Sequence, residues 1–368
     1  MSTLRTLSQR LNPSRHGSNI MKFSIGYLPD FPIPDALRVI RKADELGFHA
    51  FWTADEIYHR DPWQLCAIGS KETKRIRFGP CLTHLYLNDP TIVARNLCTL
   101  DEISNGRAAC TVGIGNIIQL DQYHVNWRGT RPTERLREGI SVMKNLLETG
   151  AITHEGRNFK YTGLSTTARA KGKVPIYLGA MGSPKSFQLA GEVTDGLMSG
   201  LGYSQEFWRD VLENLKIGAE KAGRRIDELQ VGDWINICVS RDSDAAKLAA
   251  KSVVGFSIPS MPGRQLRLHG INPADVNDLK RAVIGGDGSK VVELTSMDYV
   301  EKLSVSGTPD EIVEKLEKNF KRQGVNQIIA SIIDPPACKA LSGMSLRGIP
   351  DAIDQMEVIQ KEIAPHLT

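Results

Sequence analysis

The stretch that decides the fold is residues 80–116, which read PCLTHLYLNDP, TIVARNLCTLDEISNGR and AACTVGIGN in succession. The apolar run over residues 75–83 predicts a strand, and Asp89-Pro90 then opens a helix, because proline is well tolerated in a helix's first turn. That helix ends near Asn105-Gly106, a pair typical of a left-handed stop, and residues 107–114 predict a second buried strand. This order brings two strand ends to one edge of a parallel sheet, where ligands bind in such folds.

The same alternation of strand and helix runs along the chain. Eight apolar strand candidates, separated by helical segments, lie at residues 22–28, 48–54, 75–83, 107–114, 174–180, 195–199, 230–239 and 326–333. Asp35 is the expected cap of the first helix, and Gly47 its stop. Residues 154–161 predict a small hairpin, and residues 240–305 a mostly helical insertion between strands seven and eight. The pattern predicts an α/β fold, a (β/α)8 TIM barrel, as one domain over residues 21–368.

Composition narrows the functional classes. The chain has 368 residues, is 41% hydrophobic and carries a formal charge of only +4, so no basic surface argues for nucleic acid. Its six cysteines are scattered without close pairing, which favours reduced thiols in a cytoplasmic protein over disulfides or a zinc site. No apolar run approaches the ~18 residues that a membrane span needs. We therefore expect an enzyme of small molecules, with no metal, membrane or nucleic-acid partner.

Residues 1–20 differ from the rest of the chain. They contain no acidic residue and several Ser and Arg, a composition that also occurs in transit peptides. They lack an apolar core and a small-residue cleavage site, however. The favoured interpretation is a disordered extension, or an upstream start codon with Met21 as the natural beginning.

Two carboxylates and a histidine follow consecutive strands. Asp55-Glu56 comes after the second strand, and Thr83-His84 closes the third. A carboxylate pair at the mouth of a barrel can bind a substrate or move a proton. The alternative is that Asp55 accepts backbone N–H bonds within its loop, that Glu56 faces solvent and that His84 is structural. The candidates for catalysis are therefore Glu56, Asp55 and His84.

Two glycine-bearing loops follow the fourth and fifth strands. Glycine lets a backbone approach a flat ring or a phosphate without a Cβ collision. The second loop directly precedes the helix opened by Pro184, so that its N–H groups and a serine hydroxyl can form an anion site at a helix N-terminus. The alternative for both loops is an ordinary tight turn. The candidates for binding a phosphorylated cofactor here are Gly113, Ile114, Gly115, Asn116, Gly179, Ala180, Met181, Gly182 and Ser183.

Longer segments carry a family resemblance. They are residues 21–29 (MKFSIGYLP), 99–107 (TLDEISNGR), 113–115 (GIG), 176–182 (IYLGAMG), 189–196 (LAGEVTDG), 267–270 (RLHG) and 304–311 (SVSGTPDE). On these segments the chain resembles the bacterial luciferase-like superfamily of flavin- and deazaflavin-dependent oxidoreductases. Within that superfamily it is most similar to the coenzyme F420-dependent methylenetetrahydromethanopterin reductases.

The resemblance implies several features of the molecule. The protein should form a homodimer or a higher homo-oligomer, with a deazaflavin or flavin ring over the strand ends. A phosphate should be held by the loop from Gly179 to Ser183. A cis peptide is expected after strand three, at Cys81-Leu82. This adds Cys81, Leu82 and Thr83 to the expected cofactor contacts.

Three positions depart from these reductases. Gly26 stands where they carry a glutamate late in strand one, Glu56 where they carry the histidine of an Asp-His pair, and Asn116 where they carry an aspartate. The cofactor-side loops match while these substrate-side positions differ, which indicates a retained cofactor and a changed substrate. We therefore expect hydride transfer between F420 and a small organic substrate, with Glu56 as acid or base and Asp55 or His84 assisting. The alternatives are an FMN-dependent monooxygenase acting with oxygen and a non-catalytic flavin-binding barrel.

Overall fold

The computed structural model of the protein describes residues 20–367. Eight parallel strands close into a barrel, because β9 pairs with β11 on one side and with β8 on the other. In barrel order they are β1 (Lys22–Tyr27), β2 (Ala50–Thr53), β3 (Arg77–His84), β4 (Cys110–Gly113), β7 (Ile176–Gly179), β8 (Gly196–Gly200), β9 (Gln230–Val239) and β11 (Gln327–Ile332). The predicted (β/α)8 barrel is confirmed, with strand boundaries that differ from the predicted ones by a few residues.

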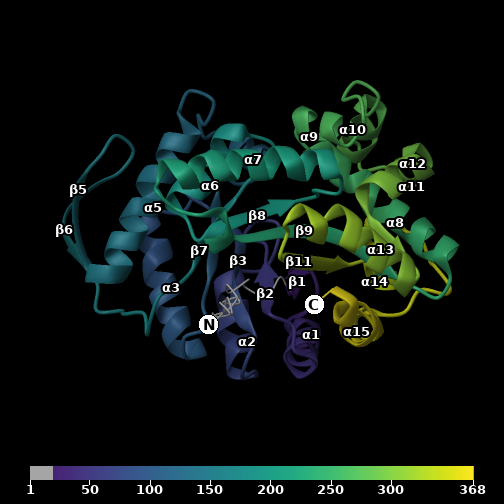
Figure 1. Cartoon of the computed structure of the whole chain (residues 1–368), viewed down its shortest axis with the longest axis horizontal. Coiled ribbons are helices and arrows are strands. Elements are labelled where there is room, and N and C mark those ends of the chain that lie inside the picture. Colours follow the sequence, from purple (N-terminus) through teal and green to yellow (C-terminus); the bar gives the residue numbers. More distant parts are fainter. Residues whose placement is uncertain (1–19, 368) are drawn as a thin grey trace, which may run out of the picture.

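Helices cover the outside of the barrel (Figure 1). The principal ones are α1 (Ile33–Leu46), α2 (Pro62–Lys71), α3 (Pro90–Ser104), α5 (Pro132–Thr149), α6 (Pro184–Val193), α7 (Gln205–Lys221) and α13 (Pro309–Asn319). As predicted, α3 begins behind Asp89, whose side chain accepts the Thr91 N–H at 2.8 Å, and it ends at Asn105 with φ of 60°. The expected cap of α1 is wrong: Pro32 is the N-cap, and Asp35 already lies in the first turn. The chain becomes helical earlier because a proline fits the first turn of a helix.

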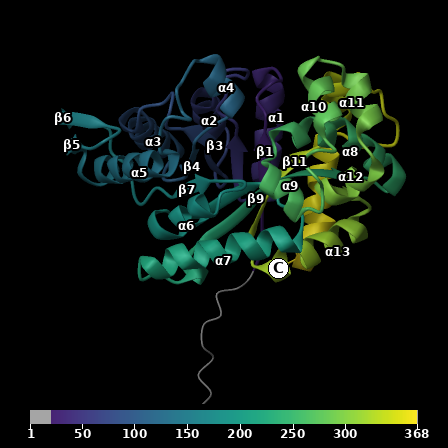
Figure 2. The same cartoon turned by 90° about the horizontal axis from the view of Figure 1, so that it is seen from above.

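Three additions extend the barrel. The hairpin β5 (Ala151–Glu155) and β6 (Lys160–Ser165) projects at one end of the molecule, and the insertion after β9 lies at the other (Figure 2). The insertion contains α8 (Ser243–Ser257), α9 (Gly263–Leu268), α10 (Asn277–Ile284), α11 (Gly288–Leu294) and α12 (Met297–Leu303). A short strand that the sequence did not predict, β10 (Val305–Gly307), returns the chain to the sheet beside β9. The C-terminal helices α14 (Pro335–Ser342) and α15 (Ala352–Val358) follow β11.

The core has two parts, as alternation along barrel strands requires. The larger part lies between the strands and the helices. The smaller part fills the barrel itself and consists of Ala50, Trp52, Ala109, Tyr177, Met198 and Ile329. Trp52 and Tyr177 meet edge to face there, with ring centroids 6.0 Å apart. The barrel is therefore a packed core, and ligands must bind above it, at the strand ends.

The sequence predicts no membrane-spanning helix, no metal site and no disulfide. Within residues 20–367, no helix combines the length and apolarity that crossing a membrane requires. The same part of the chain holds no cluster of His, Cys, Asp and Glu suited to a metal ion, and all six cysteines are free thiols. The extension at residues 1–20 lies outside the described residues except for Ile20, so its interpretation stays a prediction.

Candidate active site

A kink at the end of β3 shapes the floor of the barrel mouth. The Cys81-Leu82 peptide is cis, as the family resemblance implied, and the pairing of β3 with β4 shifts register between Cys81 and Thr83. The side chain of Leu82 then lies against two glycines. A Cβ added to Gly113 would come within 2.8 Å of Leu82 Cδ2, and one added to Gly179 within 2.4 Å. Glycine is needed at both strand ends because Leu82 occupies the space of a side chain.

The loop after β7 contains backbone N–H groups that have no hydrogen-bond acceptor among the described residues. Ser183 is the N-cap of α6, and its side chain makes no capping hydrogen bond. The backbone N–H groups of Met181, Gly182 and Ser183 donate to no atom within residues 20–367. They stand at the positive end of a helix dipole, which attracts anions. The insertion borders this loop, since a Cβ on Gly182 would lie 2.8 Å from Pro262 Cβ.

Asp55 lies in a small polar cluster behind the mouth. Thr83 donates its hydroxyl to Asp55 Oδ2 at 2.5 Å, and the Asn88 amide donates to Asp55 Oδ2 at 3.2 Å and to Thr83 Oγ1 at 3.1 Å. Burial raises the pKa of the Asp55 carboxyl above its usual value, against the opposing effect of these hydrogen bonds. The structure thus brings together two predicted site residues, Asp55 and Thr83, and adds Asn88, which the sequence did not single out.

Glu56 takes part in a different set of contacts. Its Oε1 accepts the Asn116 side-chain amide at 3.1 Å, and its Oε2 lies 3.5 Å from His59 Nε2. Burial alone would raise the pKa of Glu56, but the hydrogen bonds from His59 and Asn116 outweigh it and hold the pKa below its usual value. The Glu56 side chain is 29% exposed. Glu56 is therefore an ionised carboxylate at the mouth, and two neighbouring carboxyl groups have pKa values shifted in opposite directions.

Asn116 connects the loops that follow β2 and β4. Its Oδ1 accepts the Ile118 N–H at 2.9 Å and caps α4 (Ile117–Gln122), a short helix that the sequence analysis did not predict. Its Nδ2 is the group that reaches Glu56. The structure thus places this predicted cofactor-binding side chain on the Glu56 carboxylate rather than on the surface formed by Gly113, Gly179 and Leu82, which we call the glycine recess.

His84 ends β3 and is almost fully buried, with 4% of its surface exposed. It packs beneath Gly115, whose φ is +89° and where a Cβ would come within 2.8 Å of His84 Cβ. Burial lowers the pKa of the imidazole, and the carboxylates of Asp55 and Glu56 act in the opposite direction. His84 is thus a neutral ring beneath the two carboxyl groups.

The structure gives a physical reason for Gly26. A Cβ at this position would lie 2.8 Å from Trp234 Cε2 and 2.9 Å from Trp234 Cζ2. The indole of Trp234, on β9, therefore takes the space of a side chain at the end of β1. Trp234 was missed from the sequence because nothing in one strand reveals which side chain of a non-adjacent strand packs against it.

Apolar side chains surround the mouth on the β2 and β4 side. The loops are joined there by a hydrogen bond from the Tyr58 hydroxyl to Gln122 Oε1. The exposed members of this rim are Ile57, Tyr58, Ile117, Ile118 and Tyr123, and Ile57 is 61% exposed. An apolar rim beside an ionised carboxylate suits a substrate with an apolar body and one reacting polar group.

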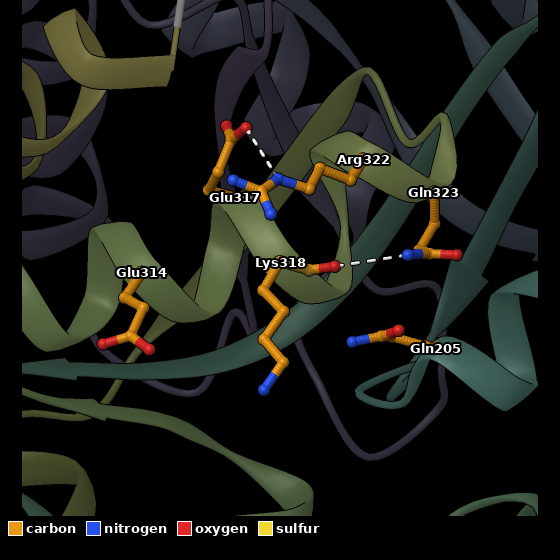
Figure 3. A pocket seen from close by; sticks show the side chains of 6 residues that line it. All are labelled: Gln205, Glu314, Glu317, Lys318, Arg322 and Gln323. Atoms are coloured by element: carbon orange, nitrogen blue, oxygen red, sulfur yellow. Dashed lines mark hydrogen bonds and ion pairs between the residues drawn. The ribbon is translucent and has the colours of Figure 1, made fainter.

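A second hollow lies outside the barrel, where α7 begins and α13 ends (Figure 3). It has a volume of about 370 Å³ and is lined by Gln205, Glu314, Glu317, Lys318, Arg322 and Gln323. Two interactions join residues of the lining: Arg322 pairs with Glu317 at 3.3 Å, and Gln323 donates to the Lys318 carbonyl at 3.3 Å. None of the strand-end residues contributes to this hollow.

Comparison with known proteins identifies the family of the chain. The family model described as luciferase-like monooxygenase matches residues 7–327. The chain is 30% identical over 352 residues to 5,10-methylenetetrahydromethanopterin reductase of Archaeoglobus fulgidus, covering 94% of this chain and 100% of that protein. It is 26% identical over 288 residues to F420-dependent glucose-6-phosphate dehydrogenase of Nakamurella multipartita, covering 74% and 79%.

Structural comparison agrees. Coenzyme F420-dependent tetrahydromethanopterin reductase from Methanopyrus kandleri superposes with a TM-score of 0.83 and 26% identity, over 95% of this chain and 99% of that one. The barrel and the oxidoreductase class are thus confirmed together. The chain belongs to the luciferase-like monooxygenase family.

Proposed function

We propose that the protein transfers a hydride between coenzyme F420 and a small organic substrate that differs from methylenetetrahydromethanopterin. The observation that carries the proposal is the glycine recess at Gly113 and Gly179, floored by Leu82 and followed by three N–H donors at residues 181–183 without protein acceptors. Relatives whose names specify F420 chemistry share this barrel over most of its length.

The recess fits a flat ring with a phosphorylated tail. Leu82, Gly113 and Gly179 would hold the ring, and the backbone from Met181 to Ser183 would hold a phosphate. When bound, F420 supplies two-electron hydride chemistry, so the protein must bind, orient and move one proton. Glu56 is the group that we assign to this proton, because its pKa is held below the usual value, it lies at the mouth, and its two oxygens face the Asn116 amide at 3.1 Å and His59 Nε2 at 3.5 Å. Asp55, with its raised pKa, and the buried ring of His84 assist electrostatically.

The inference that the substrate differs is based on the other side of the mouth, at β1 and β2. Trp234 fills the space above Gly26, where the reductases carry a glutamate, and apolar side chains of the β2 and β4 loops form the rim. At Gly26 the change replaces a carboxylate with the apolar surface of the Trp234 indole. We infer a substrate with fewer hydrogen-bonding groups than a pterin, in which one polar group meets Glu56.

Parallel titration with F420 and with FMN tests the proposal. We expect saturable binding of F420, followed by absorbance, and loss of the reduced deazaflavin's signal only when a substrate is added. Binding of FMN alone would favour a monooxygenase instead, and binding of neither would favour a barrel without catalysis. Methylenetetrahydromethanopterin and glucose 6-phosphate serve as comparison substrates, and rapid turnover of either would contradict the changed substrate.

A further inference from the structure

A histidine joins the Glu56 carboxylate to a second acid nearer the surface. His59 Nδ1 lies 2.5 Å from Asp30 Oδ1, and His59 Nε2 lies 3.5 Å from Glu56 Oε2. The two ring nitrogens thus face two different carboxylates. The histidine side chain is 12% exposed, and the Asp30 side chain is 50% exposed. The chain of contacts runs from the barrel mouth, through a mostly buried ring, to an acid in contact with solvent.

The neighbouring loop fixes this arrangement. The Arg60 guanidinium donates to the backbone carbonyls of Pro29 at 3.2 Å and of Asp30 at 2.5 Å, which holds the loop after β1 against the loop after β2. The Tyr58 ring stands edge-on to the imidazole, with centroids 6.4 Å apart. The charged groups that face His59 are therefore Asp30 and Glu56, while Arg60 is directed at carbonyl oxygens.

We propose that Asp30, His59 and Glu56 form a proton relay between the mouth of the barrel and solvent, in which His59 passes the proton to and from Glu56. This proposal rests on the proposed function, since the relay serves the one proton that accompanies hydride transfer. His59 is a positioning and relay residue, and Glu56 remains the group that meets the substrate.

The transfer balances without any further reactant. The protonated ring gives its Nε2 proton to the Glu56 carboxylate, so one N–H bond breaks, one O–H bond forms and the ring becomes neutral, while Nδ1–H stays on the Asp30 carboxylate. No electron moves, and a proton taken up from solvent restores the imidazolium between its two carboxylates. The reverse sequence exports a proton that Glu56 has taken from a substrate. The interaction with Glu56 raises the pKa of His59 above its usual value, and Asp30 adds to this effect, so the two carboxylates favour the protonated ring from which the transfer starts.

The first test needs neither cofactor nor substrate. The eight histidines can be labelled with ¹⁵N and followed by NMR against pH, with His59→Gln identifying the signal. We expect the midpoint of His59 to fall in both Glu56→Gln and Asp30→Asn, because each variant removes one carboxylate partner. An unchanged midpoint in both variants would overturn the relay. Because this experiment uses the ligand-free protein, its result is independent of whether F420 is the cofactor.

The second test separates a relay from a purely structural ion pair. We expect His59→Ala to lose roughly tenfold or more of the turnover rate and to regain part of it with added imidazoles, to an extent that depends on the pKa of the added base. F420 affinity should stay near that of the unmodified protein. Turnover that is unchanged in His59→Ala, or a loss that no added base restores, would overturn the relay even if F420 turnover itself is established.

Discussion

The two sides of the barrel mouth differ in the groups that they present: mainly backbone on one side and polar side chains on the other. At the ends of β4 and β7, the recess consists of Gly113, Gly179, the Leu82 side chain from β3 and backbone N–H groups that find no acceptor among residues 20–367. The side at β1 and β2 consists of side chains joined in hydrogen-bonded series, among them Glu56 and His59. Backbone geometry recognises a fixed ring and phosphate, while side chains determine which substrate reacts. One side can therefore be retained while the other changes, and variants on each should fail in different ways.

The largest effect is expected from Glu56→Gln. The amide keeps the size of the side chain but cannot carry the proton, and a general acid or base contributes ~10²–10⁴-fold to a rate. We expect turnover to fall by that factor, while F420 binding, measured by titration, stays nearly unchanged. Glu155→Gln is the matched control, since this glutamate lies on the hairpin and pairs only with Lys160 at the surface. Normal turnover in Glu56→Gln would make Glu56 a solvated loop residue.

For Gly179→Ala we expect the reverse: the binding of F420 should weaken, whereas the proton transfer by Glu56 is not affected directly. The new methyl group would lie 2.4 Å from Leu82 Cδ2 and 3.2 Å from Thr111 Cγ2, so that Leu82 must move into the recess. Overpacking of this kind destabilises a fold by about 1–3 kcal/mol, and the displaced Leu82 side chain should also interfere with the ring. We expect F420 to bind roughly tenfold more weakly, a loss of about 1.4 kcal/mol in binding free energy. Gly172→Ala is the control, because a Cβ there meets no atom within 4 Å. Equal F420 affinity in both variants would separate the recess from cofactor binding.

The difference between the two sides of the mouth also explains which features could be predicted from the sequence. Barrel strands are short apolar runs, and Asp89-Pro90 and Asn105 mark the ends of α3 by local chemistry, so the fold and the cofactor loops follow from neighbouring residues. The three-residue β10 and the six-residue α4 are too short to show a period. The recess depends on Leu82 facing two other strands, and the sequence reached it only through the family resemblance.

The substrate side could be predicted only in part. Glu56 and Asp55 were found because they follow a strand, but their partners come from other loops: Asp30 follows β1, and Asn116 follows β4. His59 lies only three residues after Glu56 in the sequence. This spacing does not show that the two side chains meet until the path of the loop is known. Trp234 contacts Gly26 from β9, which is separated from β1 by β11. Contacts of this kind are set by tertiary packing, which no local pattern records.

A smaller, pH-dependent effect is expected for the stability of His59→Gln. The pKa of His59 is raised in the folded protein, so its pairing with Glu56 and Asp30 stabilises the fold fully below about 6.5, the usual value for histidine. This contribution is lost as the pH rises through the folded-state pKa. The melting temperature of the variant should therefore lie furthest below that of the unmodified protein at mildly acidic pH, and the two should converge in alkaline solution. A constant difference across this range would show that the ring acts by packing alone.

The smallest effect is expected at the hollow between α7 and α13. Arg322 and Glu317 are paired there, with side chains that are 68% and 32% exposed, and exposed ion pairs contribute only about 0–1 kcal/mol. We expect Arg322→Ala to leave F420 affinity and turnover unchanged and to lower the melting temperature by no more than a few degrees. The strand-end residues are absent from the lining of this hollow, so we expect no part of it to contact a ligand of the reaction. A loss of turnover in this variant would mean that the outer surface communicates with the mouth, and the contrast between the two sides of the barrel would then not be sufficient to explain the enzyme.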